Sequence, residues 1–73
     1  MRRDEVEAVA KRRPFIPFEA RLVDGRTFRF TSPEQFVITR SAIYTADSKG
    51  RGLIIDFVMI TTLHELNQAG SAP

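Results

Sequence analysis

The chain has no cysteine and no tryptophan, and a single histidine stands among its 73 residues. Without cysteine, disulfide bonds and thiolate metal sites are excluded, and a reducing compartment is the better fit. A zinc site needs about three or four nitrogen or sulfur ligands, so one histidine does not support a zinc centre. The sequence therefore predicts neither a metal nor any other cofactor.

Long apolar runs are also missing. The longest covers residues 57–60, whereas a helix needs roughly 20 apolar residues to cross a bilayer. The N-terminal residues 1–7 lack the apolar stretch that a secretory signal peptide requires. We therefore expect a cytoplasmic protein with no membrane segment.

What is present favours one small folded domain. Hydrophobic residues make up 42% of the chain, with six phenylalanines and one tyrosine, which indicates a packed core rather than disorder. A chain of this length buries only about 60% of the surface that it exposes when unfolded, so the core is barely sufficient. We expect the domain over residues 1–66 and a disordered polar tail over residues 67–73.

A short helix is predicted over residues 5–12. Asp4 and Glu7 have the spacing of a capping box, and Pro14 ends the segment. Apolar residues recur at helical spacing on one side: Val6, Val9 and Ala10. About two turns are not stable alone, so we expect the helix to dock on the rest of the domain, with residues 15–16 packing beneath it.

The clearest local pattern is a β-hairpin around Asp24-Gly25. A two-residue loop places the apolar residues of its strands on opposite faces. A three-residue loop over residues 23–25 places them on one face, with two direct pairs: Ala20 opposite Phe28, and Phe18 opposite Phe30. Burial favours the second register, with Gly25 in the left-handed region forming a G1 bulge.

The following segments are typical of short strands and turns. They are a capped turn over residues 32–35, extended segments over 36–39 and 42–46, and a polar loop over 47–52. The sequence therefore predicts a mostly β (α+β) fold, in which a short N-terminal helix precedes a strongly bent antiparallel β meander.

The stretch from Leu53 to Leu66 is dense in β-branched residues, which favours strand over helix. Asp56 is expected to cap a short turn over residues 57–59 that divides the stretch into two strands. In extended form, one face carries Leu53, Ile55, Phe57 and Met59. The other carries Ile54, Val58 and Ile60, with only Asp56 to interrupt it.

Several motifs resemble those of a family of short uncharacterised bacterial proteins. They lie in residues 12–18, 22–28, 32–33 and 37–40. Members of this family carry a similar R-P-F-x-P-F, D-G-R and T-R order, and the likeness extends over about residues 3–66. The resemblance implies a bacterial protein and no particular activity.

The order of elements is similar to that of Sm-like proteins, which are ring-forming, RNA-binding small barrels, and to SH3-like barrels. A short helix comes first, and Asp24-Gly25 follows the first strand. The chain departs from the Sm-like pattern because residues 26–31 hold no glycine and the last strands lack an Arg-Gly or Lys-His signature. The resemblance implies a Sm-like or SH3-like small barrel, but likeness of fold alone does not transfer function.

The basic residues are the candidate contacts for nucleic acid. Eleven basic and nine acidic residues give a net charge of +2, which is typical of a mixed soluble surface. Lys11, Arg12 and Arg13 suit the helix C-terminus, while Arg21 and Arg29 share the polar face of the hairpin. The candidate phosphate-binding residues are Arg12, Arg13, Arg21 and Arg29. No exposed aromatic platform that could stack bases is evident, which weakens the case for single-strand recognition.

No constellation of residues predicts catalysis. In a strand, His64 and its acidic neighbour Glu65 point to opposite faces, so we expect a surface histidine. Asp56 suits a turn better than a buried acid, and no serine stands in a nucleophile context. We therefore expect no enzymatic activity, no catalytic residue and no small-molecule substrate.

The sequence favours a non-enzymatic interaction module that forms a homo-oligomer through its C-terminal strands. Ile54, Val58 and Ile60 place apolar side chains on a face that normally meets water, and the short helix is too small to cover them. A symmetric second copy covers such a face. The alternative is a Sm-like nucleic-acid-binding protein that contacts RNA through the arginines.

Overall fold

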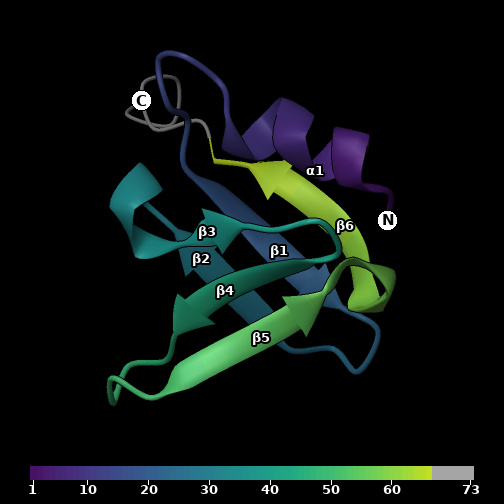
Figure 1. Ribbon diagram of the computed structural model, residues 1–73, viewed down its shortest axis with the longest axis vertical. Coiled ribbons are helices and arrows are strands. Elements are labelled where there is room, and N and C mark those ends of the chain that lie inside the picture. Colours follow the sequence, from purple (N-terminus) through teal and green to yellow (C-terminus); the bar gives the residue numbers. More distant parts are fainter. Residues whose placement is uncertain (67–73) are drawn as a thin grey trace.

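The computed structural model describes residues 1–66 (Figure 1). The elements, in chain order, are α1 (Arg3–Ala10), β1 (Phe18–Leu22), β2 (Thr27–Phe30), the 3₁₀ turn η1 (Pro33–Gln35), β3 (Val37–Ile38), β4 (Ala42–Ala46), β5 (Gly52–Asp56), the 3₁₀ turn η2 (Phe57–Met59) and β6 (Ile60–Glu65). The predicted fold class, mostly β with one N-terminal helix, is confirmed. The tail predicted for residues 67–73 lies outside the described residues.

The strands form two antiparallel sheets of three strands each. The strand orders are β2-β1-β6 and β3-β4-β5. Figure 1 shows β4 and β5 in front of β1 and β2, with α1 beside β6. Within residues 1–66, no strand pairing joins the two sheets into a closed barrel. In the same part of the chain, no helix has the length and apolar character needed to span a membrane.

The β1–β2 hairpin has the register that burial favours. Two pairs define it: Phe18 opposite Phe30, and Ala20 opposite Phe28. The Leu22 N–H donates to the Arg26 carbonyl oxygen at 2.8 Å, and the Gly25 N–H donates to the Leu22 carbonyl oxygen at 2.9 Å. Gly25 has a φ of 92°, a conformation that glycine adopts without strain. The predicted three-residue loop is confirmed.

The N-terminal helix begins and ends two residues earlier than predicted. It covers Arg3–Ala10 instead of residues 5–12, so Asp4 lies inside the first turn and does not cap it. Glu5 stabilises the helix start instead, because its Oε1 accepts a hydrogen bond from the Arg2 N–H at 2.9 Å. The position of the helix follows from packing, since two of its side chains enter the core: Val6 and Ala10.

The last apolar stretch is divided by η2, as predicted. Asp56 precedes this turn, but its side chain is exposed and makes no capping hydrogen bond. The predicted outward face of Ile60 is wrong, because η2 redirects the chain and leaves Ile60 only 3% exposed, opposite Leu22. Ile54 and Val58 do remain on the surface.

The capped turn predicted at residues 32–35 is present as η1. The Ser32 Oγ accepts a hydrogen bond from the Glu34 N–H at 3.2 Å, and Gln35 Oε1 accepts one from the Ser32 N–H, also at 3.2 Å. These bonds satisfy backbone donors that a single turn of helix leaves free.

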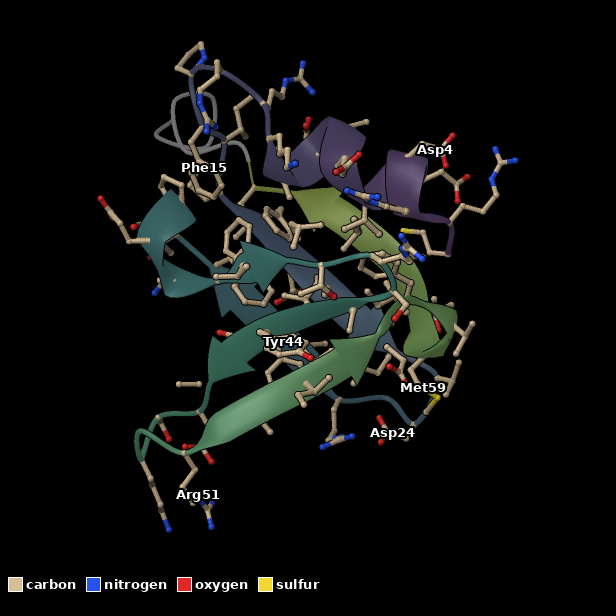
Figure 2. The ribbon with its side chains drawn as sticks, in the orientation of Figure 1. Asp4, Phe15, Asp24, Tyr44, Arg51 and Met59 are labelled. Carbon is tan, nitrogen blue, oxygen red and sulfur yellow. The ribbon has the colours of Figure 1, made fainter. Side chains whose placement is uncertain are left out.

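One core lies between the sheets and under the helix. Phe18 is fully buried, and three other rings surround it with centroid distances of 5.1, 5.6 and 6.1 Å: Phe30, Phe36 and Phe15. Phe15, labelled in Figure 2, comes from the linker that follows α1. The second sheet contributes two buried side chains, Ile43 and Ile55. The core therefore joins every part of the described fold.

We expect Gly25→Ala to lower the free energy of unfolding by roughly 1 kcal/mol, because alanine is strained at positive φ. A Cβ at this position meets no heavy atom within 4 Å, so backbone strain and not a clash is the cause. Gly25→Asn is the control, because asparagine enters the left-handed region more readily than alanine does. Chemical denaturation compares the two variants, and equal stabilities would contradict the assigned turn.

Candidate interaction surfaces

The outer face of the β2-β1-β6 sheet is polar. The pairing register builds two rows of side chains that run from β2 through β1 to β6: Arg29–Glu19–His64 and Thr27–Arg21–Thr62. Such a face is typical of an antiparallel sheet with one side in water. His64 is exposed on this face, so its predicted surface position is confirmed.

The four candidate arginines are placed in two groups: Arg21 and Arg29 on β1 and β2, and Arg12 and Arg13 on the segment after α1. Arg21 and Arg29 share the polar face as predicted, and Arg29 Nη2 lies 3.4 Å from Glu19 Oε2. Arg12 pairs with Glu65 at the end of β6. Within residues 1–66, Arg21 forms no ion pair. The hairpin therefore brings two of the four arginines onto one face.

The outer face of the β3-β4-β5 sheet breaks the polar pattern. Val37 lies opposite Tyr44, and Tyr44 lies opposite Ile54, so one line of side chains crosses all three strands. Their exposed fractions are 62%, 48% and 64%. We call these three residues the apolar row. The row ends on β5, which is an edge strand of its sheet.

Tyr44 is a candidate contact residue that sequence reasoning missed. Tyr44 is half-exposed on β4 (Figure 2), in the sheet that does not carry Arg21 and Arg29. The alternation of side chains along β4 was enough to predict that Tyr44 is exposed. Its neighbour Ile43 is fully buried, and successive strand residues point to opposite faces, so Tyr44 must point outward.

The β4–β5 loop holds two basic side chains next to the start of β5. Asp47 orders this loop, because its Oδ1 accepts the N–H groups of Lys49 and Arg51, both at 2.9 Å, and its Oδ2 accepts Arg51 Nε at 3.0 Å. These bonds, led by the one from the Arg51 N–H, hold the pKa of Asp47 below its ordinary range. Figure 2 shows Arg51 at this end of the molecule.

A groove of about 660 Å³ lies between β2 and the end of β4. Three charged residues are among those that line it: Arg29, Glu34 and Asp47. No group of three or more potential metal-ligating side chains exists within residues 1–66, so the described chain holds no metal-binding cluster. The groove therefore offers charges of both signs.

Together these features define a small antiparallel β domain of two sheets with an N-terminal helix, one polar outer face and one apolar outer face. Comparison of the chain with known protein families, with curated protein sequences and with solved structures finds no match. Function is therefore inferred from the two outer faces and from the edge strands beside them.

We expect Asp47→Asn to flatten the dependence of stability on pH. A folded-state pKa below the ordinary 3.8 means that ionised Asp47 stabilises the fold above that value, and that this contribution is lost as pH falls through the lower pKa. Asparagine keeps one acceptor oxygen but gains no proton in acid. Denaturant midpoints between about pH 6 and pH 2 should fall less in the variant than in the wild type, and equal slopes would contradict this role.

Proposed function

We propose that the protein is a cytoplasmic, non-enzymatic interaction module that acts as a homo-oligomer joined through its C-terminal strands. The observation that carries this proposal is the exposed apolar row of Val37, Tyr44 and Ile54. Contiguous exposed apolar side chains mark surfaces that bind a partner. The row crosses a whole sheet, which distinguishes it from scattered surface residues.

The contrast between the two sheets supports the proposal. Antiparallel sheets normally turn apolar side chains to the core and polar side chains to water. The β2-β1-β6 sheet follows this rule, with Arg21 and Arg29 on its outer face, whereas the β3-β4-β5 sheet carries the apolar row. Each Å² of this row that a partner covers contributes about 25 cal/mol of favourable free energy.

A second copy of the chain is the partner that we favour. A domain of this size has a small core, and any partner that binds only the folded state adds stability. The row reaches Ile54 on β5, and exposed edge strands are sites where a further strand pairs. Val58, in the η2 turn that follows β5, is a further exposed apolar side chain, with 77% of its surface exposed.

The second candidate function is Sm-like nucleic-acid binding, and Arg21 is the observation that favours it. Arg21 is exposed without an ion pair and shares its face with Arg29, so two guanidinium groups face one surface. Arg12 and Arg29 are held by carboxylates, but exposed pairs of this kind are weak and open at little cost. Tyr44 lies on the other sheet, so stacking and phosphate contacts do not share one face. This separation ranks the function second.

We expect the wild-type chain to show an oligomeric mass in light scattering at micromolar concentration. Ile54→Lys should raise the dissociation constant at least about tenfold, because it places a charge in the apolar row. Val23→Lys is the matched control, since Val23 is 62% exposed and lies outside the β3-β4-β5 sheet. A folded wild-type chain with a strictly monomeric mass would defeat the proposal.

For the alternative, we expect mixed-sequence RNA to bind at low salt and to dissociate as salt rises. Arg21→Glu should weaken binding and reduce the slope of log affinity against log salt by about one unit. Arg40→Glu makes the same charge change at an exposed position outside the β2-β1-β6 sheet and serves as the control. Fluorescence anisotropy measures both variants, and undetectable wild-type binding at low salt would remove this alternative.

A further inference from the structure

We infer that two copies of the chain join edge to edge through β5, as an antiparallel pair centred on Ile54. The inference rests on the proposed self-association and specifies where the second copy binds. We call this interface between the two β5 strands the β5 joint. Across it the two β3-β4-β5 sheets form one continuous sheet, and the two apolar rows meet end to end at the symmetry axis.

The hydrogen-bond pattern of the β4–β5 hairpin identifies the backbone groups that face the free edge. In an antiparallel ladder, bonded pairs alternate with non-bonded pairs. At one end of the ladder the Asp47 N–H donates to the Arg51 carbonyl, and beyond the other end the Phe57 N–H donates to the Ser41 carbonyl, both at 2.9 Å. Both pairs fit the β4–β5 register, so the odd-numbered residues of β5 bond to β4.

The even-numbered residues of β5 therefore turn their N–H and C=O groups away from β4. These residues are Gly52, Ile54 and Asp56, and they are spaced symmetrically about Ile54. A second β5 strand, antiparallel and centred on Ile54, presents the same groups in the complementary order. The joint forms about six hydrogen bonds, two for each of three bonded pairs.

The side chains along this edge are also self-complementary. Ile54 meets Ile54 of the second copy at the centre, which covers an apolar side chain that is 64% exposed in one chain. Asp56 lies opposite Gly52 of the second copy, whose missing side chain leaves room. The loop before that glycine carries Lys49, whereas its Arg51 pairs with Asp47, so an acidic and a basic side chain lie at each end of the joint.

The other sheet edges are less suited to this pairing. The free edge of β2 has four residues, one fewer than β5, and the groove beside it carries the acidic side chains Glu34 and Asp47. α1 lies beside β6, and β3 has only two residues. β5 thus offers the longest accessible edge within residues 1–66.

β5 also lacks the features that keep a free edge unpaired. Edge strands that stay single carry lysine, proline, a bulge or an inward-pointing charge. The sequence of β5, Gly-Leu-Ile-Ile-Asp, has none of these in its interior, and its ladder with β4 is regular. An edge of this composition is expected to be covered in solution.

A single introduced cysteine tests the joint, because the natural chain has none and any disulfide must link two copies. In the inferred pair the Cα atoms of the two residues 54 are about 5.5 Å apart, within the range of a disulfide. Ile54→Cys under mild oxidation should form covalent dimer at least about tenfold faster than Val23→Cys. The two positions are 64% and 62% exposed, so random collision gives equal rates.

Amide hydrogen exchange on the unmodified chain gives a second readout that needs no substitution. The Ile54 amide should exchange freely in dilute protein and become protected as concentration rises, because its N–H group donates a hydrogen bond only to the second copy. The Ile55 amide, which bonds to β4, is the internal control and should be protected at both concentrations. An Ile54 amide whose exchange does not change with concentration would overturn the edge pairing.

Val37→Cys separates this inference from the broader proposal. Residue 37 is 62% exposed but lies on the far strand, so its two copies are about 24 Å apart in the edge-paired dimer. An oligomeric mass with faster cross-linking at residue 37 than at residue 54 would overturn the β5 joint and leave self-association standing, with the sheets stacked face to face. A monomeric mass with equal cross-linking rates would overturn both.

Discussion

Burial of the Phe18 side chain is the contact on which the other parts of the structure depend. Its ring meets three others, one from the linker, one from β2 and one that precedes β3: Phe15, Phe30 and Phe36. Because side chains alternate along a strand, burying Phe18 turns Glu19 and Arg21 to the outer face of β1. A shift of one residue in the pairing of β1 would exchange its buried side chains with its exposed ones. The polar face is thus fixed by a contact on the opposite side of the sheet.

Side chains alternate in the same way along the strands of the second sheet, but its outer face is apolar instead of polar. Ile43 and Ile55 are buried opposite each other, which turns Tyr44 and Ile54 outward. The difference lies in the residues and not in the geometry, since both sets of alternating positions in this sheet are mostly apolar, with Thr45 and Asp56 as exceptions. Apolar residues at both sets of positions are typical of strands that are covered on both faces. The proposal of a partner on this face rests on that composition.

Sequence reasoning succeeded where local chemistry and burial agreed, and it failed where distant contacts decided. The loop at Gly25 follows from the choice between a shared apolar face and a divided one, a choice contained in one short segment. The face of Ile60 depends on how far η2 turns the chain, which residue alternation does not specify. The pair between Arg12 and Glu65 joins residues 53 positions apart, so the arginine surface depended on the assembled fold. The helix start likewise followed docking of Val6 and Ala10 rather than the predicted Asp4–Glu7 motif.

The exposed apolar side chain of β5 and its backbone groups at the free edge belong to the same residue, Ile54. The two-residue period of a β-strand explains this coincidence. Side-chain direction and hydrogen-bond direction both repeat every two residues, so they stay in phase along the strand. Leu53 and Ile55 bond to β4, and Ile55 is buried in the core, whereas Ile54 has its side chain in water and its backbone at the free edge. The loop ordered by Asp47 sets this phase, because the bond from its N–H to the Arg51 carbonyl closes the hairpin. One second strand at this edge therefore satisfies the backbone of Ile54 and covers its side chain together.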